Sequence, residues 1–218
     1  MNIGIDLDGV LTDVRGFYRF NTSLQNADLN DTRDIFHCSN EELRARWKRY
    51  LLRYATIQPA RKGARRLLRR LKNDGHTVVI ISKRVYTCRG GVKGRLMRML
   101  VRGWLMRNLI LRQSIMFCDS DQPDSKKNAC LERRIDVLVD DEPINIYSVP
   151  PVTTPICFDA HYNRNCIGEN ILRAADFEEI YNLIDGIASE RGYQARVRLR
   201  MRLLRKLLGL PSLFRERS

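Results

Sequence analysis

The fold of this chain is decided near its N-terminus, by the stretch Ile3-Gly4-Ile5-Asp6-Leu7-Asp8-Gly9-Val10-Leu11-Thr12-Asp13. A short apolar run ends in two aspartates one residue apart, followed by a glycine that lets the backbone turn sharply. If residues 1–8 form a strand, Asp6 and Asp8 share one face while Leu7 points to the other. Two crowded carboxylates repel each other unless a proton or a cation relieves them, and Mg²⁺ is the ordinary cation for such a site. The alternative interpretation is a strand followed by an acidic turn.

Two later segments repeat the pattern of an apolar run followed by polar side chains. Residues 77–81 are all β-branched and lead into Ser82-Lys83-Arg84, and residues 135–139 lead into Asp140-Asp141. Both runs are expected to be strands, with further strands near 114–118 and 153–158.

Helices are expected between these strands. Ser125 is placed to N-cap a helix that begins with Lys126-Lys127, and Asp176 with Glu179 should cap a last core helix that ends near Gly186. Two more helices are expected at 60–73 and 94–108, the second preceded by a glycine-rich loop over 89–95. Alternating strands and helices predict a parallel sheet, which binds ligands beyond the carboxyl ends of its strands. The two acid pairs, the hydroxyl and the lysine should therefore gather at one edge.

Composition fits a globular protein with one core domain and a small insertion. The chain has 218 residues, of which 44% are apolar and 29% charged. It opens directly on a strand and contains no run of about 20 apolar residues, so neither a secretory signal nor a membrane span is expected. No two cysteines form a C-x-x-C pair, which favours buried free thiols in a reducing cytoplasm at Cys38, Cys88, Cys118, Cys130, Cys157 and Cys166.

The motifs resemble those of the haloacid dehalogenase (HAD) superfamily of phosphatases, over roughly residues 1–187. The Asp-x-Asp-Gly-Val-Leu start is similar to the first motif of that superfamily, Ser82 to the second, Lys126 or Lys127 to the third, and Asp140-Asp141 to the fourth. Within the superfamily the chain looks most like bacterial relatives of the 5'(3')-deoxyribonucleotidases, to which the stretch over residues 156–163 is also similar. It departs from them at Ser82-Lys83-Arg84, where those relatives usually have Thr-Ala-Arg.

The resemblance implies a fold and a domain organisation. The expected fold is α/β, a Rossmann-like parallel sheet flanked by helices, with a small helical cap inserted in it and a basic helix at the C-terminus. Residues 1–13 and 59–187 would form the core and residues 14–58 the cap. Residues 188–218 would form the basic amphipathic tail.

The resemblance also implies an Mg²⁺-dependent phosphomonoesterase that acts on a small phosphorylated substrate, with nucleoside monophosphates as the leading class. Asp6 would be the nucleophile that becomes an aspartyl-phosphate, and Asp8 the general acid and base. Ser82, Lys83 and Lys126 would bind phosphate. Asp6, the backbone carbonyl of Asp8, and either Asp140 or Asp141 would hold the metal ion.

Two alternatives remain open. One is a phosphatase for a sugar phosphate or for a lipid-linked phosphate at the membrane surface. The other is a non-enzymatic binding module with a vestigial site, against which the intact motif set argues, because a decayed site would be expected to lose at least one member.

The C-terminal segment carries much of the charge. The net charge is +14, and residues 191–218 contain nine Lys and Arg but one acid, which gives +8. On a helix, Val197, Met201, Leu204 and Leu208 would form an apolar stripe opposite arginines. Such a helix suits an anionic membrane surface or an acidic partner, and the alternative is docking on the core or on a second copy in a homodimer. No base-reading motif is present, so no specific nucleic-acid recognition is expected. We expect a cytoplasmic protein, with a peripheral position at the inner face of the membrane as the alternative.

Overall fold

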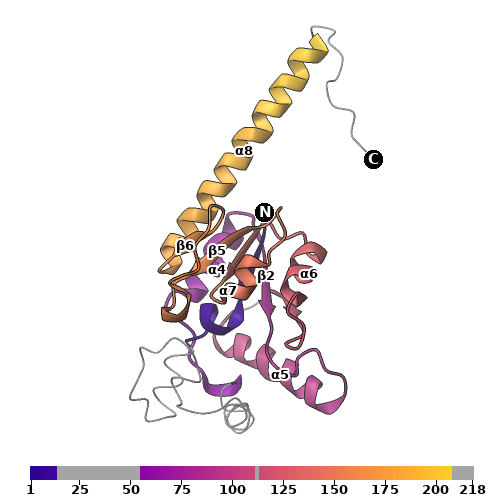
Figure 1. The fold of residues 1–218 in the computed structure, drawn as a ribbon, viewed down its shortest axis with the longest axis vertical. Helices are drawn as coiled ribbons and strands as arrows, with labels where there is room; N and C mark the ends of the chain where they lie inside the picture. Colours follow the sequence, from indigo (N-terminus) through magenta and orange to yellow (C-terminus); the bar gives the residue numbers. More distant parts are fainter. Residues whose placement is uncertain (14–54, 111–112, 208–218) are drawn as a thin grey trace. The chain divides into compact units, whose positions relative to one another are not determined.

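The structure, a computed structural model, describes residues 1–13, 55–110 and 113–207. Its centre is a six-stranded sheet in the order β3-β2-β1-β4-β5-β6, in which all neighbouring strands are parallel (Figure 1). The strands are β1 (Asn2–Asp6), β2 (Thr77–Ser82), β3 (Ser114–Phe117), β4 (Val137–Asp140), β5 (Thr154–Phe158) and β6 (Leu172–Ala174). The predicted α/β class with a parallel sheet is therefore confirmed.

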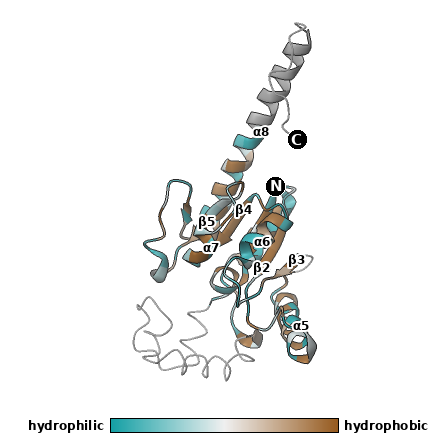
Figure 2. Ribbon diagram, turned by 45° about the vertical axis from the view of Figure 1, so that its right-hand side comes forward, coloured by the Kyte–Doolittle hydropathy of each residue, from teal (hydrophilic) through white to brown (hydrophobic). Residues whose placement is uncertain are grey.

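Helices connect the strands. They are α4 (Ala64–Asn73), α5 (Gly91–Arg107), α6 (Ser125–Glu132), α7 (Pro143–Tyr147) and α8 (Phe177–Leu207), with the short helical turns η1 (Leu7–Leu11) and η2 (His161–Asn163). Parallel strands are joined by right-handed crossovers, so the strand order places α4 and α5 on one face of the sheet and α6 and α7 on the other. In Figure 2 the strands are mainly hydrophobic, because both of their faces are covered.

The face under α6 and α7 also carries the first candidate site residues. Val79, Ile81 and Leu138 pack there with Ala129 and Cys130 of α6. Strand register places Asp6 beside Ile81, and Asp140 lies two residues after Leu138 on the same strand. Because side chains alternate along a strand, Asp6 and Asp140 point to the α6 side of the sheet.

The basic helix packs as its pattern predicted, but it begins later than expected. Leu67, Leu68 and Leu71 of α4 are buried, while Arg65 and Arg69 are exposed. The helix begins at Ala64 and not at residue 60. The reason is that Ala60 bridges Thr12 in an antiparallel pair, and the N–H of Arg61 donates to the carbonyl of Leu11 at 2.9 Å. This pairing keeps residues 60 and 61 extended.

Three other predicted boundaries are wrong by a few residues. Strand β1 ends at Asp6 and not at residue 8, because Gly9 has φ +90° and the chain turns through η1. Helix α5 begins at Gly91, so five of the seven residues of the predicted glycine-rich loop belong to the helix. Asp124, and not Ser125, is the N-cap of α6, because the Ser125 hydroxyl donates to the carbonyls of Asp119 and Gln122.

The last helix was predicted to end near Gly186, and it continues to Leu207. Its start is as expected: the Asp176 carboxylate accepts hydrogen bonds from the N–H groups of Glu178 and Glu179 at 2.8 and 2.9 Å. A glycine inside a helix costs only about 1 kcal/mol, and good helix formers follow Gly186. None of the helices in the described part of the chain is long and apolar enough to cross a membrane.

The chain divides into two compact units, Met1–Tyr181 and Asn182–Ser218. The predicted cap, residues 14–58, falls outside the described residues except for its last four positions. The boundaries of cap, core and tail therefore stay predictions.

The cysteines in the described residues are free, and four of them are buried: Cys118, Cys130, Cys157 and Cys166. Cys88 differs from the expectation because it is exposed. Cys38 lies outside the described residues. Burial raises the pKa of the Cys118, Cys130 and Cys157 thiols to about 12, so these groups stay protonated and inaccessible at neutral pH.

We therefore expect iodoacetamide at pH 8 to alkylate Cys88 in the native protein while Cys118, Cys130 and Cys157 react only after unfolding. Peptide mass mapping before and after addition of denaturant measures this. Alkylation of Cys118 or Cys130 at the rate of Cys88 in the native state would contradict the burial of these thiols.

Candidate functional site

The carboxyl ends of three adjacent strands bring most of the predicted site residues together. Strand β1 lies between β2 and β4, with Ile5 level with both Ile80 and Val139. Asp6 and Asp140 therefore end neighbouring strands at the same height, and Ser82 ends the strand on the other side of β1. The predicted edge of the sheet is the edge at which these side chains meet.

Lys126 joins the two strand-end aspartates. Its ammonium donates to Asp6 Oδ1 at 2.6 Å and to Asp140 Oδ2 at 2.5 Å, and all three residues are at least 97% buried. The neighbouring Lys127 is exposed on the solvent side of α6. Of the two lysines that the sequence left open, the structure brings Lys126 into the cluster.

Asp141 completes an acidic cluster with Asp6 and Asp140. One ligand atom from each of these buried residues lies within 4.8 Å of the others. Burial raises the pKa of Asp6 well above its usual value, although Lys126 opposes this shift, and burial together with Asp140 raises the pKa of Asp141 to about 7. Burial alone would lower the pKa of Lys126, but Asp140 and Asp6 outweigh it and raise that pKa, so the lysine stays charged.

The cluster is electrostatically unbalanced when its three carboxylates are ionised. Three negative charges face the one ammonium of Lys126, which leaves a formal charge of −2 in a buried site. Such an excess is costly in the protein interior unless protons or a cation relieve it. Carboxylate oxygens are the ligands that hard divalent cations prefer, so the donor set fits a divalent metal ion.

Asp8 lies beside this cluster and has a partner of its own. It belongs to η1, and its carboxylate accepts hydrogen bonds from Arg84 Nε at 3.1 Å and from Arg84 Nη2. Arg84 is 4% exposed, and its backbone N–H donates to Ser82 Oγ at 3.3 Å. The guanidinium therefore fixes the direction of the Asp8 carboxylate.

The structure does not bring Lys83 to the cluster. Its ammonium donates to the carbonyl of Pro123 at 3.2 Å, on the exposed side of the edge. The side chain that enters the site from this segment is Arg84, one residue later, because alternate residues point to opposite sides where the chain is extended.

Sequence reasoning missed several residues that hold the acidic pair. Asn145 Nδ2 donates to Asp140 Oδ1 at 3.1 Å, and the N–H of Glu142 donates to the same oxygen at 3.0 Å. The Tyr162 hydroxyl donates to Asp141 Oδ2. Asn145 follows Asp140 by five residues, in α7, and Tyr162 lies in the stretch 156–163 that resembles the deoxyribonucleotidase relatives, so a weak signal existed for each.

Gly9 is required where η1 meets Asp141. It has φ +90°, and a Cβ at this position would collide with the Asp141 carboxylate. Its N–H donates to Thr12 Oγ1 at 3.2 Å, and its carbonyl accepts from Arg61 Nε at 3.0 Å. The turn after the first strand is thus held from both sides.

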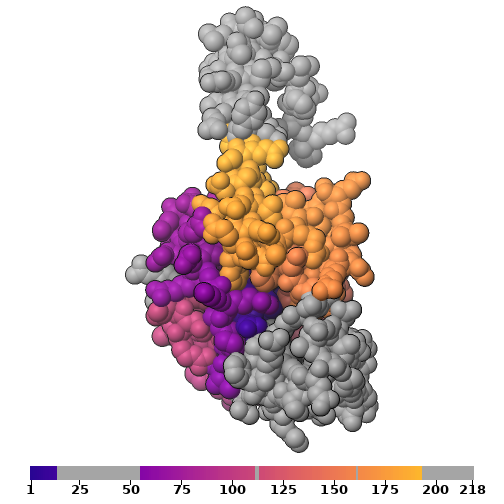
Figure 3. All heavy atoms as spheres, turned by 90° about the vertical axis from the view of Figure 1, so that its left-hand side faces the viewer, coloured from indigo at the N-terminus to yellow at the C-terminus, as the bar shows by residue number. Residues whose placement is uncertain are grey.

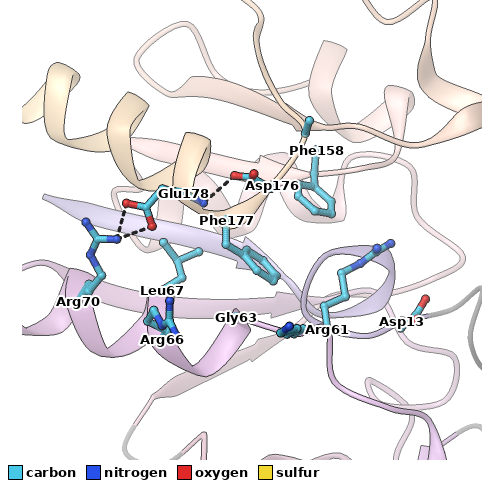
Figure 4. Close-up of a pocket in the computed structure, with 12 residues that line it drawn as sticks. Asp13, Arg61, Gly63, Arg66, Leu67, Arg70, Phe158, Asp176, Phe177 and Glu178 are labelled. Carbon is cyan, nitrogen blue, oxygen red and sulfur yellow. Dashed lines mark hydrogen bonds and ion pairs between the residues drawn. The ribbon is translucent and has the colours of Figure 1, made fainter.

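A hollow of about 500 Å³ is lined by residues of α4 and of the start of α8, and Asp6, Asp140 and Asp141 are not among its lining residues (Figure 4). The guanidinium of Arg61 lies 5.1 Å from the centre of the Phe158 ring, which stacks on Phe177 with 5.5 Å between ring centres. In Figure 3 this face shows α4 (purple) next to a small area of the first thirteen residues (indigo). Four basic residues (Arg61, Lys62, Arg66 and Arg70) and three acidic ones (Asp13, Asp176 and Glu178) line the hollow, so nothing selects a ligand of one sign.

Comparisons with known proteins agree with the resemblance seen in the motifs. Residues 1–191 match the family described as 5' nucleotidase, deoxy (pyrimidine), cytosolic type C protein (NT5C). No curated protein matches the chain significantly.

Solved structures share the fold at low sequence identity. A predicted phosphatase from Clostridium acetobutylicum has a TM-score of 0.54 at 14% identity, covering 84% of this chain and 97% of its own. A HAD family hydrolase from Deinococcus radiodurans has 0.51 at 16% identity, covering 88% and 96%. The D,D-heptose bisphosphate phosphatase from B. bronchiseptica, in complex with magnesium and phosphate, has 0.52 at 13% identity, covering 84% and 97%.

Two glycine substitutions separate backbone strain from the contact with Asp141. Gly9→Ala and Gly75→Ala both place a side chain at positive φ, which costs about 1 to 2 kcal/mol. Nothing lies within 4 Å of a Cβ at Gly75, whereas a Cβ at Gly9 meets Asp141. We expect Gly9→Ala to lower the free energy of unfolding clearly more than Gly75→Ala does, measured by urea denaturation. Equal losses would show that Asp141 is not held against this turn.

Proposed function

The chain belongs to the cytosolic type C 5'-nucleotidase (NT5C) family, a group of HAD-type phosphatases, and from this premise we propose that it is an Mg²⁺-dependent phosphomonoesterase that forms an aspartyl-phosphate on Asp6. The observation that carries the proposal is the buried cluster of Asp6, Asp140 and Asp141 around Lys126 at the carboxyl edge of the sheet.

The residues present fit an Mg²⁺ ion. The ion would be held by Asp6, by Asp141 and by the backbone carbonyl of Asp8, and Asp140 would not be a direct ligand. We assign Asp141 as the direct ligand of the acidic pair because both oxygens of Asp140 already accept hydrogen bonds, from Lys126 and Asn145 among others. When bound, the ion would supply positive charge against the phosphate oxygens.

Each site residue then has a defined task. Asp6 Oδ1 accepts from Lys126, which leaves Oδ2 to attack phosphorus and form the acyl-phosphate. Lys126 and the hydroxyl of Ser82 would offset and bind the phosphate oxygens. Lys83, on the exposed side of the same edge, would bind phosphate only after leaving Pro123.

Asp8 would act as the general acid and then as the general base. It would protonate the leaving oxygen and later take a proton from the water that hydrolyses the acyl-phosphate. Arg84 holds this carboxylate by two hydrogen bonds. A carboxylate fixed in this way needs little reorientation during the reaction.

The proposed substrate is a nucleoside monophosphate, and the family description points to pyrimidine deoxyribonucleotides. Sugar phosphates and lipid-linked phosphates are the competing classes. Release of inorganic phosphate from a panel of all three classes, with Mg²⁺ present, tests the choice. Turnover confined to a sugar phosphate or to a lipid-linked phosphate would overturn the nucleotide proposal while leaving the chemistry intact.

The nucleophile is tested by Asp6→Asn. We expect loss of turnover by several orders of magnitude, because the amide is a poor nucleophile and a weaker cation ligand. Asp121→Asn is the control, since Asp121 is an exposed carboxylate whose partners, Arg89 and Ser120, lie on the surface. Full turnover in Asp6→Asn, or undiminished wild-type turnover with excess chelator, would exclude the mechanism.

The acid is tested by Asp8→Asn with substrates of different leaving groups. The loss in kcat should be severe for an alkyl phosphate and smaller for p-nitrophenyl phosphate, whose leaving group needs less protonation. Equal losses for both substrates would argue against Asp8 as the acid.

We further propose that the basic C-terminal segment brings the enzyme to an anionic membrane surface in the cytoplasm. The support is the continuation of α8 to Leu207 and the +8 charge of residues 191–218. Each basic residue near the surface would contribute about 1 kcal/mol, screened within a Debye length.

A variant with Arg198, Arg202, Arg205 and Lys206 changed to Glu tests this proposal. The wild-type chain should sediment with phosphatidylserine vesicles and dissociate at high salt, whereas the variant should stay in solution with unchanged turnover of a soluble substrate. A wild-type chain that ignores the vesicles but forms a dimer, which the variant does not form, would favour packing against a second copy instead.

A further inference from the structure

Asp141 is clamped between two elements that are distant in the sequence. On one side its carboxylate lies against Gly9, where a Cβ would collide with it. On the other side the hydroxyl of Tyr162 donates a hydrogen bond to its Oδ2. Asp141 is 4% exposed, so these contacts, more than solvent, set the direction of its carboxylate.

Tyr162 is anchored through its neighbour Asn163. The side-chain nitrogen of Asn163, Nδ2, donates to the backbone carbonyls of Asp141 at 2.7 Å and Phe158 at 2.8 Å. Asn163 is fully buried. Its side-chain oxygen accepts from the N–H of Ala160 at 2.9 Å. One side chain therefore ties the loop after β5 to the backbone of the residue whose carboxylate Tyr162 holds.

Arg173 of β6 fixes this loop in turn. Its Nη1 donates to the carbonyls of Asn163 at 2.9 Å and Cys166 at 2.8 Å, and its Nη2 pairs with Asp159 at 2.5 Å. The loop from Asp159 to Cys166 thus has several charged or buried hydrogen bonds although it contains little regular structure. These contacts set its position relative to Asp141.

We infer that Tyr162 is a positioning residue that holds the Asp141 carboxylate toward Asp6 and Asp140 and thereby raises the affinity of the site for a divalent cation. The inference rests on the proposed function, because it requires Asp141 to be a metal ligand. Residues that hydrogen-bond to a metal-binding carboxylate orient it, and their loss typically weakens metal binding about 10- to 100-fold.

The phenol suits this task chemically. A tyrosine hydroxyl is a neutral group that can donate one hydrogen bond to a carboxylate oxygen, as Tyr162 does to Asp141 Oδ2. A neutral donor directs one carboxylate oxygen without cancelling its charge, unlike Lys126 or Arg84, which compensate the charge of their partners. Tyr162 therefore orients Asp141 without adding a positive charge that would compete with the cation.

The test is the affinity of the metal-free protein for Mn²⁺, a probe for the Mg²⁺ site, in wild type and Tyr162→Phe. Electron paramagnetic resonance of free Mn²⁺ gives the dissociation constant without any turnover. We expect Tyr162→Phe to weaken binding at least 10-fold, to keep the thermal midpoint of the metal-free protein, and to recover kcat to within about twofold at saturating Mg²⁺.

Tyr147→Phe is the matched control. The Tyr147 hydroxyl bonds to the carbonyl of Asn165 at 3.2 Å, in the same loop region, and does not contact the acidic cluster. Its Mn²⁺ affinity should equal that of the wild type. Equal weakening in both variants would overturn the inference, because the effect would then be a general loosening of the loop.

The outcomes also separate this inference from the proposed function. Tight Mn²⁺ binding by the wild type with unchanged binding by Tyr162→Phe overturns only the role of Tyr162. A wild-type protein that binds no divalent cation overturns both. Weaker binding in Tyr162→Phe with kcat still reduced at saturating Mg²⁺ would assign Tyr162 to the chemical step and overturn a positioning role.

Discussion

The structure depends on one buried ion triad, in which the ammonium of Lys126 lies between the carboxylates of Asp6 and Asp140. Removing such charges from water costs several kcal/mol per ion, and this cost is offset only where the partners are close and well aligned. Both distances, 2.6 and 2.5 Å, meet that condition. The triad therefore holds β1, β4 and the start of α6 in one arrangement.

The same triad explains why this edge can do chemistry. One ammonium cannot balance three carboxylates, so the cluster keeps an affinity for positive charge that a divalent cation would satisfy. The groups around it hold the carboxylates in place without neutralising them fully: Asn145 supports Asp140, Tyr162 supports Asp141, and Arg84 fixes Asp8 at the rim. A site prepared in this way would need little rearrangement to bind a phosphate and the proposed metal ion.

Much of the fold could be predicted from the sequence because the central strands have clear apolar and β-branched patterns. The β-branched run before Ser82 and the apolar run before Asp140 can form little but buried parallel strands, and both do. Strand β6 was not anticipated, since Leu172–Ala174 is only three residues long and has no alternating pattern. The start of α4 was misplaced because the bridge between Thr12 and Ala60 joins residues far apart in the chain. The length of α8 was underestimated because a single glycine is a weak helix terminator.

By itself the sequence determined the order of the elements, the edge of the sheet at which the polar groups meet, and the identity of the acidic residues. These follow from periodicity and from the direction of parallel strands, which are local properties. Only the tertiary structure decided that Lys126 and not Lys127 reaches the cluster, that Arg84 pairs with Asp8, and that Tyr162 holds Asp141. Lys126 pairs with a carboxylate 120 positions away, and Arg84 with one 76 positions away. No local pattern encodes such contacts, because they depend on how α6, η1 and the loop after β5 pack on the finished sheet.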